Sequence, residues 1–168
     1  MSATINVNKR TVVHKSSNGI STAFPDVCKT PTPGGPVPIP YPNIAQSSDT
    51  ANGSKTVSMD GHSIMLKGSD FCTSTGDEAG SAGGGVMSGK IKGKAEFVNY
   101  SFDVKVEGKN VPRLGDMMVQ NKGSPANTPP MPEMQPPLVV LEAPEQDQQA
   151  QCMQTAAENA TPFVSSVM

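Results

Sequence analysis

The chain has 168 residues, a net charge of −2, 35% apolar residues and 16 each of glycine and proline. This composition favours turns and extended segments, and the scattered lysines and arginines exclude the clustered basic face that nucleic-acid binding needs. No apolar run approaches the roughly 18 residues of a membrane span, and the N-terminus lacks the apolar region of a signal peptide. We therefore expect one domain plus an extension, without a nucleic-acid partner.

A short pattern occurs three times, at Ile5 to Ser16, Val57 to Gly68 and Val104 to Gly115. In each copy an apolar residue precedes a two-residue turn signal, and a second apolar residue follows that turn by three positions. The copies read Val7, Asn8-Lys9 and Val12; Met59, Asp60-Gly61 and Ile64; and Val106, Glu107-Gly108 and Val111. Each copy predicts a small β-hairpin. Three related hairpins about fifty residues apart predict a single pseudo-threefold domain, and such symmetry suggests a threefold partner.

A proline-rich segment follows the first hairpin. Residues 24–43, FPDVCKTPTPGGPVPIPYPN, hold seven of the sixteen prolines. Alternating prolines predict an extended ribbon that cannot be a central strand. Because the segment lies between two repeats, we interpret it as an internal structural strap, and a ligand for a proline-recognising domain is the alternative.

Six glycines between Gly76 and Gly89 follow the second hairpin and predict close backbone approach or mobility. Gly84 to Lys90 matches part of a phosphate-binding loop, but Ile91 stands where a magnesium-binding Ser or Thr should be, so a packing loop is favoured. Alternation at residues 94–108 then predicts a strand that changes face near Phe97, for example through a bulge.

The chain becomes proline-rich from Lys122 onward. We expect the β domain to occupy residues 1–122, a proline-rich linker to occupy 123–144, and a tail to occupy 145–168. Proline at the first turn and apolar residues at helical spacing predict one marginal helix in the tail, whose weakly apolar face needs a partner.

Two imidazoles and two thiols match the ligand set of a structural zinc site; they are His14, Cys28, His62 and Cys72. Their spacings lack the C-x-x-C clustering typical of zinc sites, and the two histidines fall at different positions of the repeat. The alternative is two surface histidines and two small buried cysteines without a metal.

Catalytic residues are not indicated. A nucleophile needs a base within hydrogen-bond reach and a group that orients the base. The adjacent pair Asp77-Glu78 would point to opposite faces of a strand, and no pocket-forming architecture is visible. We therefore predict that the protein is not an enzyme. The alternative is a small secreted effector in which Cys28 or Cys72 acts as a nucleophile beside a histidine.

The proline-rich segment, extended to FPDVCKTPTPGGPVPIPYPNIA, and the later stretch STGDEAGSAGGGVMSGKIKGKAEFVNYSFDVKVEGKNVPR resemble the PAAR-like domains of type VI secretion systems, in the subgroup with a PIPYPN signature. The resemblance covers roughly residues 4–121. It implies an all-β, conical, pseudo-threefold fold built from three hairpins, which caps the trimeric spike protein VgrG. The three hairpins would contact the three spike chains, and the narrow end would touch the target membrane transiently.

The resemblance also implies a bound zinc ion and a route of secretion. Related tips hold zinc near the apex, commonly through three histidines and one cysteine. This chain has two histidines and lacks the Pro-Ala-Ala-Arg motif, and Cys28 is the candidate ligand inside the shared signature. We expect assembly in the bacterial cytoplasm and secretion by the type VI system without a signal peptide. The roughly 46 residues after Lys122 are few for an enzyme domain, so we expect this tail to dock a separate effector or chaperone.

Overall fold

The structure, a computed structural model, describes residues 4–136. These residues form fifteen short strands in antiparallel sheets and a single 3-10 turn, which confirms the predicted all-β fold. The elements are β1 (Asn6–Val7), β2 (Arg10–Thr11), β3 (Ile20–Thr30), β4 (Val37–Gln46), η1 (Ser47–Asp49), β5 (Thr50–Ala51), β6 (Ser58–Met59), β7 (His62–Ser63), β8 (Asp70–Phe71), β9 (Ser74–Thr75), β10 (Gly84–Gly85), β11 (Lys94–Phe97), β12 (Lys105–Val106), β13 (Lys109–Asn110), β14 (Met117–Lys122) and β15 (Met131–Met134).

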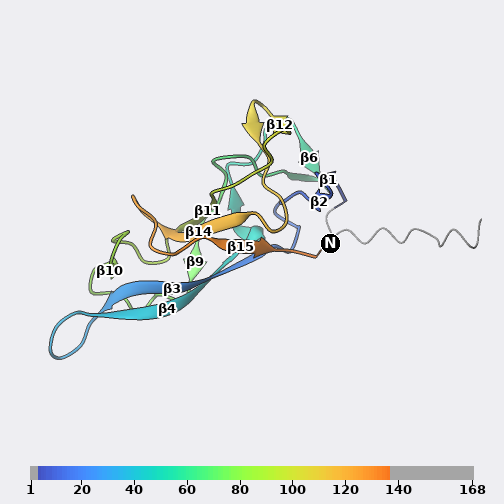
Figure 1. Ribbon diagram of the computed structural model, residues 1–168. Helices are drawn as coiled ribbons and strands as arrows, with labels where there is room; N and C mark the ends of the chain where they lie inside the picture. The colour runs from blue at the N-terminus through green and yellow to red at the C-terminus, as the bar shows by residue number, and fades with distance from the viewer. Residues whose placement is uncertain (1–3, 137–168) are drawn as a thin grey trace, which may run out of the picture. The chain divides into compact units, whose positions relative to one another are not determined.

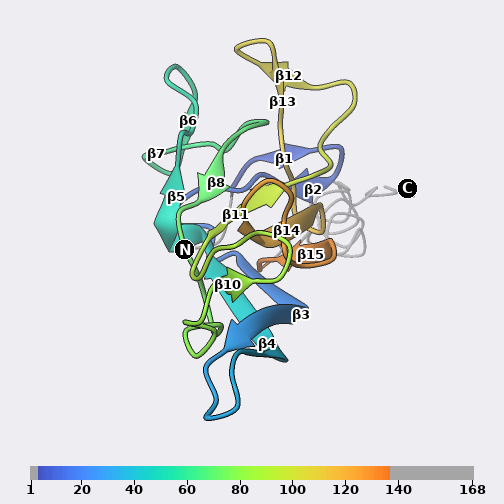
Figure 2. The ribbon, with the colours of Figure 1, turned by 90° about the vertical axis from the view of Figure 1, so that its left-hand side faces the viewer.

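The three predicted hairpins are present as three separate two-stranded sheets, β1–β2, β6–β7 and β12–β13. They lie together at one end of the described domain in both views (Figures 1 and 2). Both central residues of each turn have positive φ: Asn8 and Lys9, Asp60 and Gly61, Glu107 and Gly108. This is the backbone that a tight two-residue hairpin turn requires, because its twist matches that of the flanking strands.

The hairpins share one apolar core. Its buried members come from all three repeats and are Val12, Met59, Ile64, Leu66 and Val111, with Val7, Val104 and Val106 packed against them. The apolar residues that flank each turn in the sequence pattern are therefore the residues that meet in the centre. A single hairpin is marginal in water, so the three stabilise one another by burying this shared surface.

Backbone contacts close the hairpins into a ring. The residues just after one hairpin bridge the outer strand of the next, and the three contacts occupy corresponding positions of the repeat. These are the bridges of His14 with Ile64 and of Arg113 with Val12, and the bond from Lys67 N to Asn110 O at 2.8 Å. The counterpart of that bond beside the second bridge is Leu114 N donating to Thr11 O. The same capping bond follows each hairpin as well: Ser17 Oγ accepts from His14 N, Ser69 Oγ from Leu66 N, and Asp116 Oδ2 from Arg113 N.

Side chains repeat the same cyclic pattern. The first turn residue of each hairpin hydrogen-bonds to the residue that immediately precedes a neighbouring repeat: Asn8 Nδ2 donates to Asp103 at 3.1 Å, Thr4 Oγ1 donates to Asp60 at 2.8 Å, and Thr56 Oγ1 donates to Glu107 at 2.8 Å. Three corresponding links joined head to tail confirm the pseudo-threefold arrangement. We call this assembly of β1–β2, β6–β7 and β12–β13 the hairpin ring.

The remaining strands form one larger sheet in the order β5-β8-β11-β14-β15-β3-β4-β9, with β10 also paired to β3. Its longest part is the β3–β4 ribbon, which extends away from the hairpin ring (Figures 1 and 2). Strand β9 pairs with β4 only at Ile44 and Ala45. The proline-containing part of β4 is therefore paired on one side only, which agrees with the exclusion of this segment from the centre of a sheet.

A second apolar cluster lies within this sheet. Its buried members are Val13, Ala45, Met65, Phe71, Ala95, Phe97 and Met118. The rings of Phe71 and Phe97 meet edge to face with centroids 6.1 Å apart, a favourable aromatic geometry. The register irregularity in β11 falls between Lys94 and Glu96, close to the change of face predicted near Phe97.

The sheet continues past the expected domain boundary at residue 122. Strand β15, inside the expected linker, pairs with both β14 and β3. Glu133 N donates to Asp116 O at 3.0 Å and Gly115 N donates to Glu133 O at 2.8 Å, so this segment is part of the β domain. The high proline content of residues 123–144 indicated a linker and hid this strand. A strand as short as β15 needs only a few backbone N–H groups to pair with its two neighbours. The predicted tail helix lies outside the described residues, and residues 4–136 contain no helix long and apolar enough to cross a membrane.

Candidate metal centre beneath the glycine-rich loop

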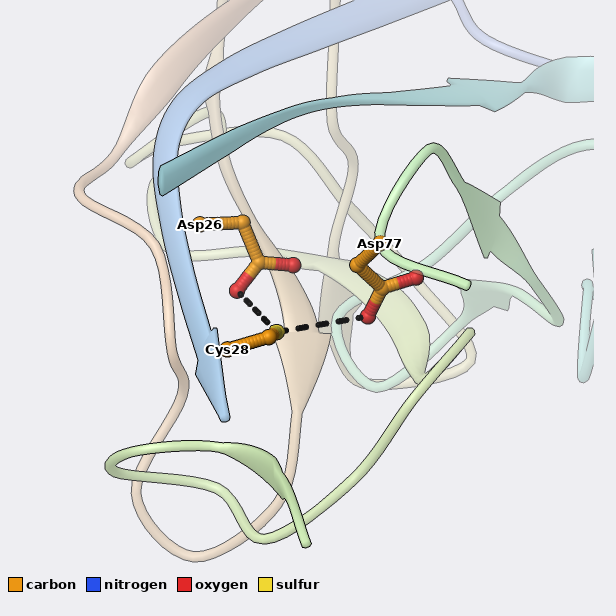
Figure 3. Close-up of side chains that lie close together, drawn as sticks. All are labelled: Asp26, Cys28 and Asp77. Atoms are coloured by element: carbon orange, nitrogen blue, oxygen red, sulfur yellow. Dashed lines mark hydrogen bonds between the residues drawn. The ribbon is translucent and has the colours of Figure 1, made fainter. Parts of the chain in front are cut away.

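A thiol and two carboxylates meet inside the domain where the β3–β4 ribbon leaves the sheet. Asp26 and Cys28 are two positions apart on β3 and therefore share one face of the strand, while Asp77 comes from the turn after β9. Figure 3 shows the three side chains pointing toward one another. Cys28 Sγ lies 3.6 Å from Asp26 Oδ1 and 3.9 Å from Asp77 Oδ2. All three residues are fully buried, and we call them the Asp–Cys–Asp group.

The glycine-rich segment packs over this group. A Cβ atom at Gly80 would lie 2.3 Å from Cys28 Cβ, a distance that the native backbone could not accommodate. Gly84 and Gly85 form β10 and pair with Lys29 and Cys28 of β3. The glycines therefore allow close backbone approach, as the packing-loop interpretation predicted.

Asparagine amides surround the Asp–Cys–Asp group. Asn43 Nδ2 and Asn127 Nδ2 donate to the two carboxylate oxygens of Asp26, and Asn121 Nδ2 lies 3.7 Å from Cys28 Sγ. Lys92 N donates to both oxygens of Asp77 at 3.1 Å. These partners are neutral. In residues 4–136 no lysine or arginine side chain forms an ion pair with Asp26 or Asp77.

This environment keeps the thiol protonated when no cation is bound. Burial, followed by the charges of Asp26 and Asp77, raises the pKa of Cys28 to about 12. Burial also raises the pKa of Asp77, with the charge of Asp26 adding to the effect. A thiol with so high a pKa is a poor nucleophile. One donor atom from each of the three residues lies within 4.8 Å of the others, so the group could bind a metal ion.

The structure does not bring the four predicted zinc ligands together. Cys28 belongs to the Asp–Cys–Asp group, which is the one set of three such donors within 4.8 Å among residues 4–136. Cys72 is exposed. No histidine in the described part of the chain hydrogen-bonds to either thiol. The arrangement therefore offers neither the Cys/His dyad nor a four-ligand site composed of these residues.

The two histidines lie instead in the hairpin ring. Their rings stack with centroids 6.0 Å apart, and His14 Nε2 lies 3.5 Å from Asp60 Oδ2. His14 is fully buried, contrary to the surface histidine of the alternative reading, and its burial lowers its pKa. It is buried because it occupies the repeat position that Leu66 fills in the second hairpin.

Sequence reasoning missed Asp26 and Asp77 as members of the group. Asp26 could have been found, because an Asp-x-Cys spacing on a predicted strand places both side chains on one face. Asp77 carried no such signal. It reaches Cys28 only because the turn after β9 folds back beneath β3, and the sequence separation between the two residues is 49.

Comparison with known proteins identifies the family. The family model described as "Toxin PAAR-like domain" matches residues 19–129. The DNase toxin Tse7 of Pseudomonas aeruginosa is 43% identical over 137 residues, which cover 77% of this chain and 36% of Tse7; the chain thus spans about a third of that relative. No solved structure matches. The prediction that the protein is not an enzyme is contradicted by this finding, because the relative is a DNase toxin. The chain belongs to the toxin PAAR-like domain family and is a PAAR-like protein of the type VI secretion system.

Proposed function

We propose that residues 4–136 form the spike-tip domain of a type VI secretion toxin and dock on the trimeric spike protein VgrG through the hairpin ring. The observation that carries this proposal is the ring itself, in which three hairpins are joined by corresponding backbone and side-chain links. A trimer presents three equal surfaces around its axis. A single chain can match all three at once only if it presents a similar surface three times.

The ring offers both kinds of contact that such docking needs. Among the described residues, β1, β6 and β12 each pair with a single strand, and a strand edge without a partner can pair with a strand of another chain. The residue that begins each repeat is also apolar: Ile5 and Val57 are exposed, and Val104 is half-buried. Apolar side chains at corresponding positions would give each spike chain a similar anchor.

Docking can be tested by mixing the full chain with the trimeric spike on a mass-resolving column. We expect a complex of one chain with three spike chains, and we expect the double variant Ile5→Asp/Val57→Asp to weaken it. Val86→Asp is the matched control, because Val86 is equally exposed but lies on the glycine-rich loop. Absence of a complex with the native chain, or equal binding by both variants, would contradict the proposal.

We infer that the delivered activity is DNA cleavage, because the curated relative is a DNase toxin. This proposal makes DNA a substrate and so replaces the expectation that the protein has no nucleic-acid partner. The full chain incubated with plasmid DNA and a divalent cation should then nick or linearise the plasmid. Cys28→Ser and Cys72→Ser, assayed beside it, separate this activity from the alternative of a thiol nucleophile. If both variants still cleave the plasmid, a thiol nucleophile is excluded. If the native chain leaves the plasmid intact, the proposal that this chain has DNase activity is wrong.

The tail, residues 145–168, stays the predicted docking segment for an effector or chaperone, outside the described residues. Because β15 belongs to the sheet, a deletion that tests the tail should begin after Pro136. We expect the truncated chain to keep spike binding and to lose cargo. We also propose assembly in the bacterial cytoplasm followed by type VI secretion, so the chain should reach the culture medium only from cells with a working secretion sheath.

A further inference from the structure

The outer edge of the β3–β4 ribbon is a long strand edge that has almost no partner among the described residues. Strands β3 and β4 are eleven and ten residues long and pair with each other along their length. On its other side β4 pairs only with β9, at Ile44 and Ala45. An edge of this kind is usually a place where a strand of another chain, such as a second copy of the same protein, can add to the sheet.

The pairing shows which backbone groups face this edge. In an antiparallel pair, residues alternate between those bonded to the partner strand and those whose N–H and C=O groups point away from it. The carbonyl oxygens of Val27 and Lys29 on β3 point away from β4, because they accept hydrogen bonds from the glycine-rich segment on the other side. Their partners on β4 are Pro40 and Pro38. The backbone groups of these two prolines therefore point away from β3, toward the open edge.

Proline occupies each position of this stretch that faces the edge. Pro38, Pro40 and Pro42 are two residues apart, which is the period of a strand, and we call them the edge prolines. Because proline has no backbone N–H, the edge offers carbonyl oxygens at these positions and no donors. A strand added here would bury its own carbonyl groups without hydrogen-bond partners, which is unfavourable.

We propose that the edge prolines close the β3–β4 ribbon to strand addition, so that a second copy of this chain cannot pair with it edge to edge. The residues between the prolines show why protection is needed. Val37 is 44% exposed, and Ile39 and Tyr41 are half-buried; all three are residue types that favour strands. Strand edges are often protected by charged side chains, but β4 contains none. Proline takes over that role here.

The inference gives the proline-rich segment a role beyond that of an internal strap. Strands β1, β6 and β12 of the hairpin ring contain no proline, so their edges keep their donors. Strand addition is thus prevented on the ribbon and remains possible at the ring. The closed edge does not depend on spike docking, so either proposal can fail while the other holds.

The test restores the missing donors in the full chain with the double variant Pro38→Thr/Pro40→Thr. Threonine favours strands and is polar, so the change adds two N–H groups without adding a large apolar surface. On a mass-resolving column we expect the native chain to elute with the mass of one chain and the variant to shift to twice that mass as its concentration rises. Pro129→Thr/Pro130→Thr is the matched control, because these two prolines are also exposed but lie in the loop before β15. It should elute as the native chain does.

A second variant separates strand pairing from other kinds of association. Pro38→Lys/Pro40→Lys restores the same two N–H groups but sets like charges against each other in a paired dimer, so it should keep the mass of one chain. If Pro38→Thr/Pro40→Thr does not fold, the two single threonine variants decide by the same measurement.

Three results would overturn the proposal. The first is a folded threonine variant that keeps the mass of one chain at every concentration. The second is equal association of the threonine variant and its loop control, which would show that the ribbon edge is not the surface involved. The third is a native chain that is already dimeric and that Pro38→Lys/Pro40→Lys makes monomeric, which would show that the edge is open in spite of its prolines.

Discussion

The hairpin ring and the Asp–Cys–Asp group are organised on opposite principles. The ring is repeated and apolar in its centre, and its links join corresponding positions of three similar segments. The Asp–Cys–Asp group is unique and polar, and its surroundings come from β3, β4, the turn after β9 and the segment after β14. One small domain thus combines a part built by repetition of a local pattern with a part built by contacts between distant segments, and a substitution in one part need not disturb the other.

The link between the third hairpin and the large sheet is tested at Glu133. This residue lies on β15, and its backbone bonds to Gly115 and Asp116, which directly follow the third repeat. Burial and the charge of Asp116 raise its pKa from 4.5 to about 8, and both carboxylate oxygens lack hydrogen-bond partners. From pH 4.5 to 8 the unfolded chain has lost this proton while the folded chain keeps it. Stability should therefore fall as pH rises through this window, by up to about 1.4 kcal/mol per unit. Urea unfolding at several pH values should show this slope in the native chain and a flatter one in Glu133→Gln; equal slopes would contradict it.

The shared core of the ring is tested by Leu66→Ala. Leu66 is 2% exposed and packs in the apolar cluster that all three hairpins supply. Its truncation should lower the free energy of unfolding by about 2–5 kcal/mol, because a cavity remains where the side chain was. Val98→Ala is the control, since Val98 is 47% exposed and should change stability by less than about 0.5 kcal/mol. Similar losses in both variants would show that the hairpins do not depend on a common core.

The packing of the glycine-rich loop over Cys28 is tested by Gly80→Ala. The added Cβ would meet Cys28 Cβ at 2.3 Å, so we expect a loss of about 1–3 kcal/mol from overpacking. Gly34→Ala is the matched control, because nothing lies within 4 Å of a Cβ there. Thermal unfolding of the two variants compares them directly. If Gly80→Ala is as stable as Gly34→Ala, the loop does not lie against β3 as described.

The smallest expected effect concerns one link of the ring. Glu107 accepts hydrogen bonds from Ser54, Lys55 and Thr56 at 2.7–2.8 Å, and the hydroxyls of Ser54 and Thr56 lower its pKa from 4.5 to about 2. The stability that this carboxylate contributes is present above pH 4.5 and is lost as pH falls toward 2. Glu107→Gln should therefore lower the melting temperature slightly at pH 7 and should differ less from the native chain at pH 2. A difference that does not shrink in acid would argue against a charge-dependent link.

Local patterns predicted the ring well. Turn signals such as Asp60-Gly61 specify a hairpin within a few residues, and apolar residues on both sides of each turn show which face is buried. The links between repeats were not predicted, because Asn8 with Asp103 or Thr56 with Glu107 join residues about 50 to 95 positions apart. The same limit explains β15. The prolines of residues 123–144 indicated a linker, but the pairing of β15 with β14 and β3 depends on strands far away in the sequence.

The sequence by itself determined the all-β class, the three hairpins, the extended proline ribbon and the family, since each follows from residues close together along the chain. Tertiary structure alone decided which polar residues meet. His14 and His62 stack in the ring, whereas Cys28 lies with Asp26 and Asp77. The reason is physical: a turn or a strand depends on the conformational preferences of neighbouring residues, but a buried polar group depends on where distant segments fold back on one another. Spacing along the chain does not carry that information.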